Sequence, residues 1–216
     1  MTTGRICSAI PRASGQVAMN ELSNHDHSRF LTRTNHKVGR TNTLGPQAAE
    51  QGINKAVFRE GVVIQMTWTG APTIYYGDEA GVCGFTDPDN RRTYPWGHED
   101  QVLLAFHKDI IRLRRENEEL RSGSLKMLES DYNFISYGRF NRKGQCAVLI
   151  NNNNHPITKE IHVWEIGTPK TGKMKVILQS RDDGYCMEGA EYEIKAGKIL
   201  IEMPQTSATI LKFIEE

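Results

Sequence analysis

The spacing of apolar residues changes from helical to strand-like near residue 122, and this change limits the folds open to the chain. Before it, apolar side chains recur every three or four positions in residues 47–65 and again in residues 99–120, which predicts two amphipathic helices. After it, the apolar runs are short and separated by turn residues. We therefore expect an α/β domain over residues 1–121 and an all-β domain over residues 122–216.

The second half contains short runs whose composition is typical of β-strands. Turn signals such as residues 142–144 and 182–184 separate them. The predicted strands are residues 134–137, 147–150, 160–164, 175–178, 191–194, 198–202 and 209–213. Several strands at this spacing are typical of an antiparallel β-sandwich.

The first half alternates between strand and helix signals. A partly apolar stretch over residues 16–22 precedes the first predicted helix, and the β-branched and aromatic run 73–76 precedes the second. Alternation of this kind is typical of a (β/α)₈ barrel, but a whole barrel needs about 250 residues. The part before residue 122 is less than half of that, so we expect only part of a barrel in this chain.

Composition excludes several classes of function. The net charge is +1 with no block of like charge, which argues against nucleic acid as a partner. No window of the length needed to span a membrane is apolar throughout. Cys7, Cys83, Cys146 and Cys186 are scattered without paired spacing, so we expect reduced thiols, a cytoplasmic location, and neither a metal nor another cofactor.

The polar cluster Ser23-Asn24-His25-Asp26 is the first candidate site. It follows a predicted strand, and catalytic groups of barrels lie at the C-terminal ends of strands. An Asp beside a His in that place is suited to binding a sugar hydroxyl. The alternative interpretation is that Asn24 and Asp26 only cap a turn.

The second candidate is the glycine-rich loop over residues 77–81, where Asp78 and Glu79 follow the predicted strand 73–76. Adjacent residues of an extended chain point to opposite sides. The two carboxylates therefore cannot face one substrate together. We expect one to approach the site and the other to bind backbone or a nearby arginine.

The third candidate is the loop over residues 86–96, which combines Asp, Arg and aromatic residues. Planar polar groups bind vicinal hydroxyls, and aromatic faces pack on the apolar face of a pyranose, so the composition suits a carbohydrate. The alternative is an internal Asp–Arg pair that fixes the loop, with Tyr94 and Trp96 as its small core.

The three segments, in this order and at these distances, resemble glycoside hydrolase family 13, and within it the neopullulanase, cyclomaltodextrinase and maltogenic-amylase group. The resemblance extends over nearly the whole chain from about residue 16. It implies that the first two segments end the seventh and eighth strands of the catalytic barrel. By the same resemblance, Asp26 is the carboxylate that stabilises the transition state, His25 binds the sugar in subsite −1, and Asp87 with Arg91 binds glucose on the non-reducing side.

The resemblance also implies what the chain lacks. A retaining glycosidase needs a nucleophile and a general acid about 5–5.5 Å apart, and in this family both lie on the fourth and fifth strands. Only 23 residues precede Asn24, and none of them forms such a segment. We therefore expect an α-glucan or maltooligosaccharide partner but no hydrolysis by the chain alone.

Three interpretations remain open at this point. The chain is part of an α-1,4- or α-1,6-glucan hydrolase that needs the missing barrel half, or it forms a homo-oligomer that covers its open edges. Alternatively, it is a noncatalytic carbohydrate-binding or interaction module. The third interpretation is an inert structural remnant.

Overall fold

A computed structural model describes residues 12–215. Cys7 lies outside these residues. Cys83 and Cys146 are buried free thiols, and Cys186 is a half-buried free thiol. No helix among the described residues has both the length and the apolar character that crossing a bilayer requires. The cytoplasmic location stays a prediction.

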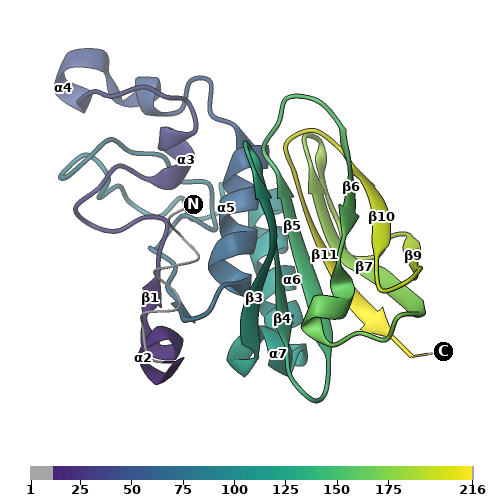
Figure 1. The fold of residues 1–216 in the computed structure, drawn as a ribbon. Coiled ribbons are helices and arrows are strands. Elements are labelled where there is room, and N and C mark those ends of the chain that lie inside the picture. The colour runs from purple at the N-terminus through teal and green to yellow at the C-terminus, as the bar shows by residue number, and fades with distance from the viewer. Residues whose placement is uncertain (1–11, 216) are drawn as a thin grey trace.

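The first half of the chain is mostly helix and loop (Figure 1). Its elements are α2 (Arg12–Val17), β1 (Met19–Asn20), α3 (Phe30–Arg33), α4 (Thr41–Leu44), a 3₁₀ helix over Pro46–Ala49, α5 (Lys55–Thr67), β2 (Ala71–Pro72), α6 (Gln101–Glu116) and α7 (Glu118–Ser122).

The strands β1 and β2 pair in parallel, with Met19 opposite Ala71 and Asn20 opposite Pro72. The prediction of a strand over residues 73–76 was wrong, because the strand ends at Pro72. The physical reason is that β1 offers only two residues for pairing, so the β-branched and aromatic residues that follow have no neighbouring strand there. They run instead into the loop that carries Asp78.

The first predicted helix is divided in two. A 3₁₀ helix ends at Ala49, and α5 begins only after Asn54. Gly52, at φ +74°, interrupts the helix. The Asn54 side chain then caps α5 by accepting from the backbone N–H groups of Ala56 and Val57 at 2.9 and 3.1 Å.

The second predicted helix is also divided, at Asn117, whose backbone is extended. Its side-chain amide donates to the Leu113 carbonyl at 2.7 Å, which satisfies one of the last carbonyls of α6. At the other end, Asp100 caps α6 by accepting from Val102 and Leu103. Asn117, a polar residue within the repeat of apolar positions, therefore ends α6.

The regular elements described in the second half are strands, apart from a 3₁₀ helix over Val163–Ile166. Its strands are β3 (Ser124–Asp131), β4 (Phe134–Phe140), β5 (Gln145–Asn151), β6 (Ile157–Ile161), β7 (Gly172–Arg181), β8 (Gly184–Cys186), β9 (Glu191–Ile194), β10 (Ile199–Met203) and β11 (Ser207–Ile214). The predicted antiparallel pairing is confirmed. Sequence patterns missed β3 and β8, and residues 162–164 are not strand.

The larger sheet has seven strands, in the order β3-β4-β5-β11-β7-β8 with β9 also on β7, and the strands β6 and β10 form a separate pair. Both faces of the large sheet are covered. On β5, Val148 and Ile150 pack in a core with the helices, whereas Ala147 and Leu149 pack in a second core with β6 and β10. This alternation follows from the two-residue period of a strand.

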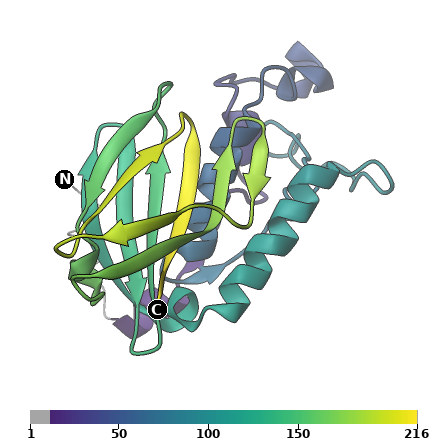
Figure 2. The same cartoon turned by 90° about the vertical axis from the view of Figure 1, so that its right-hand side faces the viewer.

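The core between the helices and the sheet joins the two predicted domains. It contains Phe58 of α5 and Phe106 of α6 from the first half, with Tyr137 and Ile210 of the sheet from the second. Figure 1 shows α5 and α6 between the sheet and the loops of residues 20–50, and Figure 2 shows both helices behind the sheet. The division at residue 121 stays a prediction, and each side of it contributes to one shared core.

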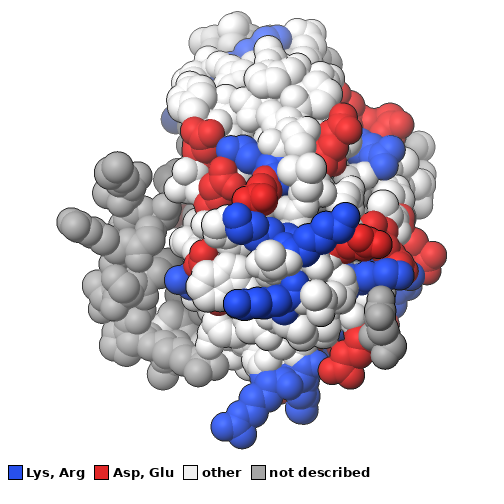
Figure 3. All heavy atoms as spheres, turned by 45° about the vertical axis from the view of Figure 1, so that its right-hand side comes forward, with Lys and Arg blue, Asp and Glu red and all other residues white. Residues whose placement is uncertain are grey.

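Charges of both signs are interspersed on the face drawn in Figure 3. The second half of the chain contains ion pairs such as Lys159 with Glu129 at 2.6 Å and Lys198 with Glu160 at 2.8 Å. These pairs are partly exposed, so each contributes at most about 1 kcal/mol to stability.

Candidate functional site

The loop after β1 is a tight turn that presents His25 and Asp26 to solvent. The Asn24 side chain forms the turn by accepting from the backbone N–H groups of Asp26 at 2.9 Å and His27 at 3.1 Å. The side chains of His25 and Asp26 are 64% and 68% exposed, with His25 Nε2 3.4 Å from Asp26 Oδ1. The turn interpretation is therefore right for Asn24. The Asp26 carboxylate faces His25 instead.

A buried arginine fixes the backbone beside this turn. Arg29 is fully buried. Its Nη1 donates to Asp78 Oδ1 at 2.9 Å and to the Tyr76 carbonyl at 2.7 Å, and its Nε donates to the Asn90 carbonyl at 2.9 Å. The guanidinium also lies over the Tyr75 ring, 4.3 Å from its centroid. This one side chain, three residues after the first candidate segment, thus contacts the second and the third.

The adjacent carboxylates Asp78 and Glu79 point to different surroundings, as predicted. Asp78 pairs with Arg29. Burial raises the pKa of Asp78 to about 6, against the opposing effect of hydrogen bonding from Ser23 and the charge of Arg29. Glu79 lies near Tyr94, whose pKa is raised by burial and then by the Glu79 charge. Asp78 therefore holds the loops together rather than meeting a ligand.

The loop over residues 86–92 closes on the Asp26 turn. Asn90, which is fully buried, donates to the carbonyls of Asn24 at 3.1 Å and His27 at 2.6 Å. Thr86 Oγ1 donates to the Asp26 carbonyl at 2.9 Å. The backbone that carries His25 and Asp26 is therefore held from the opposite side by this loop.

The same loop presents Asp87 and Arg91 as a half-exposed pair. Arg91 Nε donates to Asp87 Oδ1 at 2.5 Å, and their side chains are 50% and 45% exposed. Arg91 Nη2 also reaches the His25 carbonyl at 3.5 Å. The internal Asp–Arg pair is present, as the second interpretation predicted, and it lies directly beside His25.

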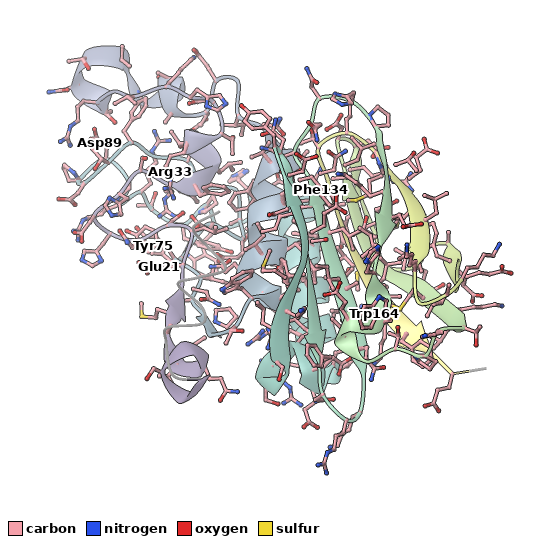
Figure 4. All side chains as sticks on the ribbon, in the orientation of Figure 1. Glu21, Arg33, Tyr75, Asp89, Phe134 and Trp164 are labelled. Carbon is pink, nitrogen blue, oxygen red and sulfur yellow. The ribbon has the colours of Figure 1, made fainter. Side chains whose placement is uncertain are left out.

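The structure therefore brings all four predicted site residues onto two contacting loops. Figure 4 shows Glu21, Tyr75 and Asp89 on the same side of the molecule, on the loops that surround these residues. Among the residues described, no group of three or more His, Cys, Asp and Glu side chains is arranged to hold a metal ion. The arrangement suits hydrogen bonding to a polyhydroxylated ligand.

Sequence reasoning did not predict which residues support the site: Ser23 and Asn90 lie in candidate segments, but their contacts were not expected, and Arg29 was not a candidate. Arg29 and Asn90 make the contacts between loops, and Ser23 Oγ accepts from the Phe30 N–H at 2.9 Å where α3 begins. A single arginine in a polar loop gives no local sign that it is buried. Its role is visible only when the chain brings Asp78 and Asn90 to it.

Comparisons with known proteins agree on one family. A model of the alpha-amylase catalytic domain matches residues 5–118. The amylopullulanase of Thermoanaerobacter thermohydrosulfuricus is 32% identical over 196 residues, which cover 89% of this chain and 13% of the relative. Neopullulanase 2 of Thermoactinomyces vulgaris is 32% identical over 205 residues, which cover 93% of this chain and 30% of the relative.

Solved structures show the same fold. The Anoxybacillus α-amylase matches 99% of this chain and 41% of its own, with a TM-score of 0.75 at 23% sequence identity. This chain thus corresponds to a part of each of these larger proteins.

Proposed function

The chain belongs to the alpha-amylase family, and we propose that it supplies the sugar-binding side of an α-glucan hydrolase site. The support is the exposed Asp26–His25 pair, whose backbone is held by Asn24, Thr86 and Asn90. A carboxylate carried on a fixed backbone needs less reorganisation when positive charge develops on a sugar ring.

Each of the four site residues has a proposed role. Asp26 stabilises the oxocarbenium-like transition state of a retaining glycosidase. His25 donates a hydrogen bond to a hydroxyl of the same sugar. Asp87 and Arg91 bind hydroxyls of the neighbouring glucose. Because both side chains are half-exposed, each can form hydrogen bonds to sugar hydroxyls in place of some of those it makes to the other.

We propose that this chain alone does not cleave glucosides. Cleavage with retention needs an attacking carboxylate and a proton donor flanking the bond. Three carboxylates on the loops around Asp26 have partners within the chain: Asp78 with Arg29, Asp87 with Arg91, and Asp89 with the Thr41 N–H at 2.8 Å. None of them is placed as a free nucleophile opposite Asp26.

The test is an assay of the purified chain on cyclomaltodextrin, pullulan and a chromogenic maltoside. We expect no turnover above a buffer blank, and no difference between the parent and Asp26→Asn. Hydrolysis that survives repeated purification and disappears in Asp26→Asn would show that the chain cleaves glucosides by itself, against the proposal.

A second candidate function is a noncatalytic carbohydrate-binding module. The observation that favours it is the engagement of Asp78, Asp87 and Asp89, which leaves the loops suited to binding rather than to bond cleavage. Calorimetric titration with maltotriose separates the two. Binding by the chain itself favours a module, whereas binding only after an upstream barrel half is added favours a divided active site.

We also propose a protein partner for the parallel pair β1–β2. Each of these strands pairs with only one strand among the described residues, which leaves backbone groups available on its other edge. Either an upstream barrel half or a second copy of the chain would cover these edges. Light scattering of the purified chain, with and without the upstream half, distinguishes a homo-oligomer from a complementing partner.

A further inference from the structure

Trp96 is a large aromatic side chain left open to solvent on the loop that leads into α6. It is 80% exposed, so the interpretation of Trp96 as part of a small buried loop core is wrong for the described structure. Figure 2 shows this loop projecting beyond the body of the molecule. An exposed tryptophan on a projecting loop presents a wide apolar face with a polar N–H at its edge.

Local contacts hold the Trp96 ring in place. Tyr94 supports it, with ring centroids 4.4 Å apart and an interplanar angle of 46°. The backbone under the ring is held as well: the Trp96 backbone N–H donates to the Tyr94 carbonyl at 3.0 Å, and the His98 backbone N–H donates to the Pro95 carbonyl at 2.8 Å. A ring ordered before binding loses little conformational entropy when a ligand covers it.

The same loop connects the Trp96 ring to the sugar-binding residues. Tyr76 is 43% exposed, and its hydroxyl donates to the carbonyl of Arg92, the residue after Arg91, at 2.7 Å. Trp96 lies five positions after Arg91, so at most roughly 18 Å of extended chain joins the two. A short oligosaccharide bound at Asp87 and Arg91 can span such a distance.

We propose that Trp96, supported by Tyr94, is a stacking platform for a glucose unit of an α-glucan, beyond the units bound by His25, Asp26, Asp87 and Arg91. This inference rests on the proposed function. The ring face covers the apolar C–H face of a pyranose, which is a contact that tolerates rotation of the sugar and needs no buried hydrogen bond. Its contribution therefore appears with longer oligosaccharides and is small for the shortest ones.

The test compares Trp96 with Trp164, a matched exposed tryptophan that is 51% exposed. Figure 4 places Trp164 on the opposite side of the molecule from Tyr75 and Asp89. Maltotriose and maltohexaose are titrated by calorimetry into the parent chain, Trp96→Ala, Trp96→Phe and Trp164→Ala. Circular dichroism spectra establish that each variant is folded.

We expect Trp96→Ala to weaken maltohexaose binding roughly three- to tenfold, the range of an aromatic stacking contact, with a smaller effect on maltotriose. Trp96→Phe retains most of the affinity, and Trp164→Ala retains all of it. The change in tryptophan emission at saturating maltohexaose is lost in Trp96→Phe and kept in Trp164→Ala.

Two results overturn the inference in distinguishable ways. If the parent binds maltohexaose, Asp87→Ala loses that binding and Trp96→Ala keeps the parent's affinity, the platform is refuted and the proposed function stands. If the parent and Trp164→Ala bind no maltooligosaccharide, either alone or after an upstream barrel half is added, the proposed sugar site fails and the platform fails with it.

Discussion

Arg29 and Asp78 form an ion pair at 2.9 Å in which the side chains are 0% and 6% exposed. The pair joins the segment after β1 to the segment after β2, and Arg29 extends the connection to Asn90 on the third loop. The position of Asp26 relative to Asp87 and Arg91 thus depends on a contact that involves none of the three.

Replacing Arg29 should destabilise the fold severely. Arg29→Met leaves Asp78 buried without its cation, and breaking a buried pair in this way costs about 3–5 kcal/mol. Urea denaturation measures the free energy of unfolding. The control is Arg91→Met, which breaks a half-exposed pair and should cost no more than about 1 kcal/mol. Equal losses in the two variants would contradict the role given to burial.

The stability of the chain should fall with rising pH because of Glu60. This α5 residue is 4% exposed, and its Oε1 has no hydrogen-bond partner among the described residues. Burial, with a smaller effect from Asp182, raises the pKa of Glu60 from 4.5 to about 8. Between these values the folded chain holds a proton that the unfolded chain releases. The contribution of the Glu60 proton to the free energy of unfolding is therefore complete below pH 4.5. It is lost as the pH rises through 8, at up to about 1.4 kcal/mol per pH unit.

The measurement is the difference in unfolding free energy between the parent and Glu60→Gln at several pH values from 5 to 8. Glutamine is neutral throughout, so the parent should lose stability relative to the variant at each step upward. Parallel pH curves for the two proteins would show that Glu60 titrates normally.

The cap of α5 should be worth about 0.5–2 kcal/mol. Asn54→Ala removes the oxygen that accepts from Ala56 and Val57, so two N–H groups at the start of α5 lose their partner. Asn54→Asp keeps an acceptor and adds a negative charge that favours a helix N-terminus, so it should retain most of the stability. Thermal unfolding of the three proteins checks the order, and an Asn54→Asp as unstable as Asn54→Ala would argue against capping.

The hydrogen bond between the Tyr137 hydroxyl, on the sheet, and Thr67, on α5, should stabilise the fold. The Tyr137 hydroxyl lies 2.6 Å from Thr67 Oγ1, which in turn donates to the Val63 carbonyl at 2.6 Å. Because Thr67 already donates elsewhere, Tyr137 is the donor, and Tyr137→Phe leaves a buried acceptor unsatisfied at a cost of about 1–2 kcal/mol. Tyr132→Phe, at a ring 86% exposed, is the neutral control. Chemical denaturation should show the loss in Tyr137→Phe alone.

Local patterns predicted much of the fold. The three- and four-residue period over residues 99–120 predicted α6, and the short β-branched runs after residue 122 predicted β4, β5, β7 and β11. Local patterns were less reliable where the secondary structure of a segment depends on pairing with another strand. Residues 73–76 have the composition of a strand, yet their backbone continues as a loop because β1 pairs only with Ala71 and Pro72.

The sequence by itself determined the family resemblance, the helical and strand-like halves, and the four candidate residues His25, Asp26, Asp87 and Arg91, because residue type and spacing are local properties. Only the tertiary structure decided that Asp78 is paired with Arg29, that Asn90 holds the Asp26 turn, and that one core joins the helices to the sheet. These contacts join residues far apart along the chain. Their energies depend on burial, which exists only once the chain has folded.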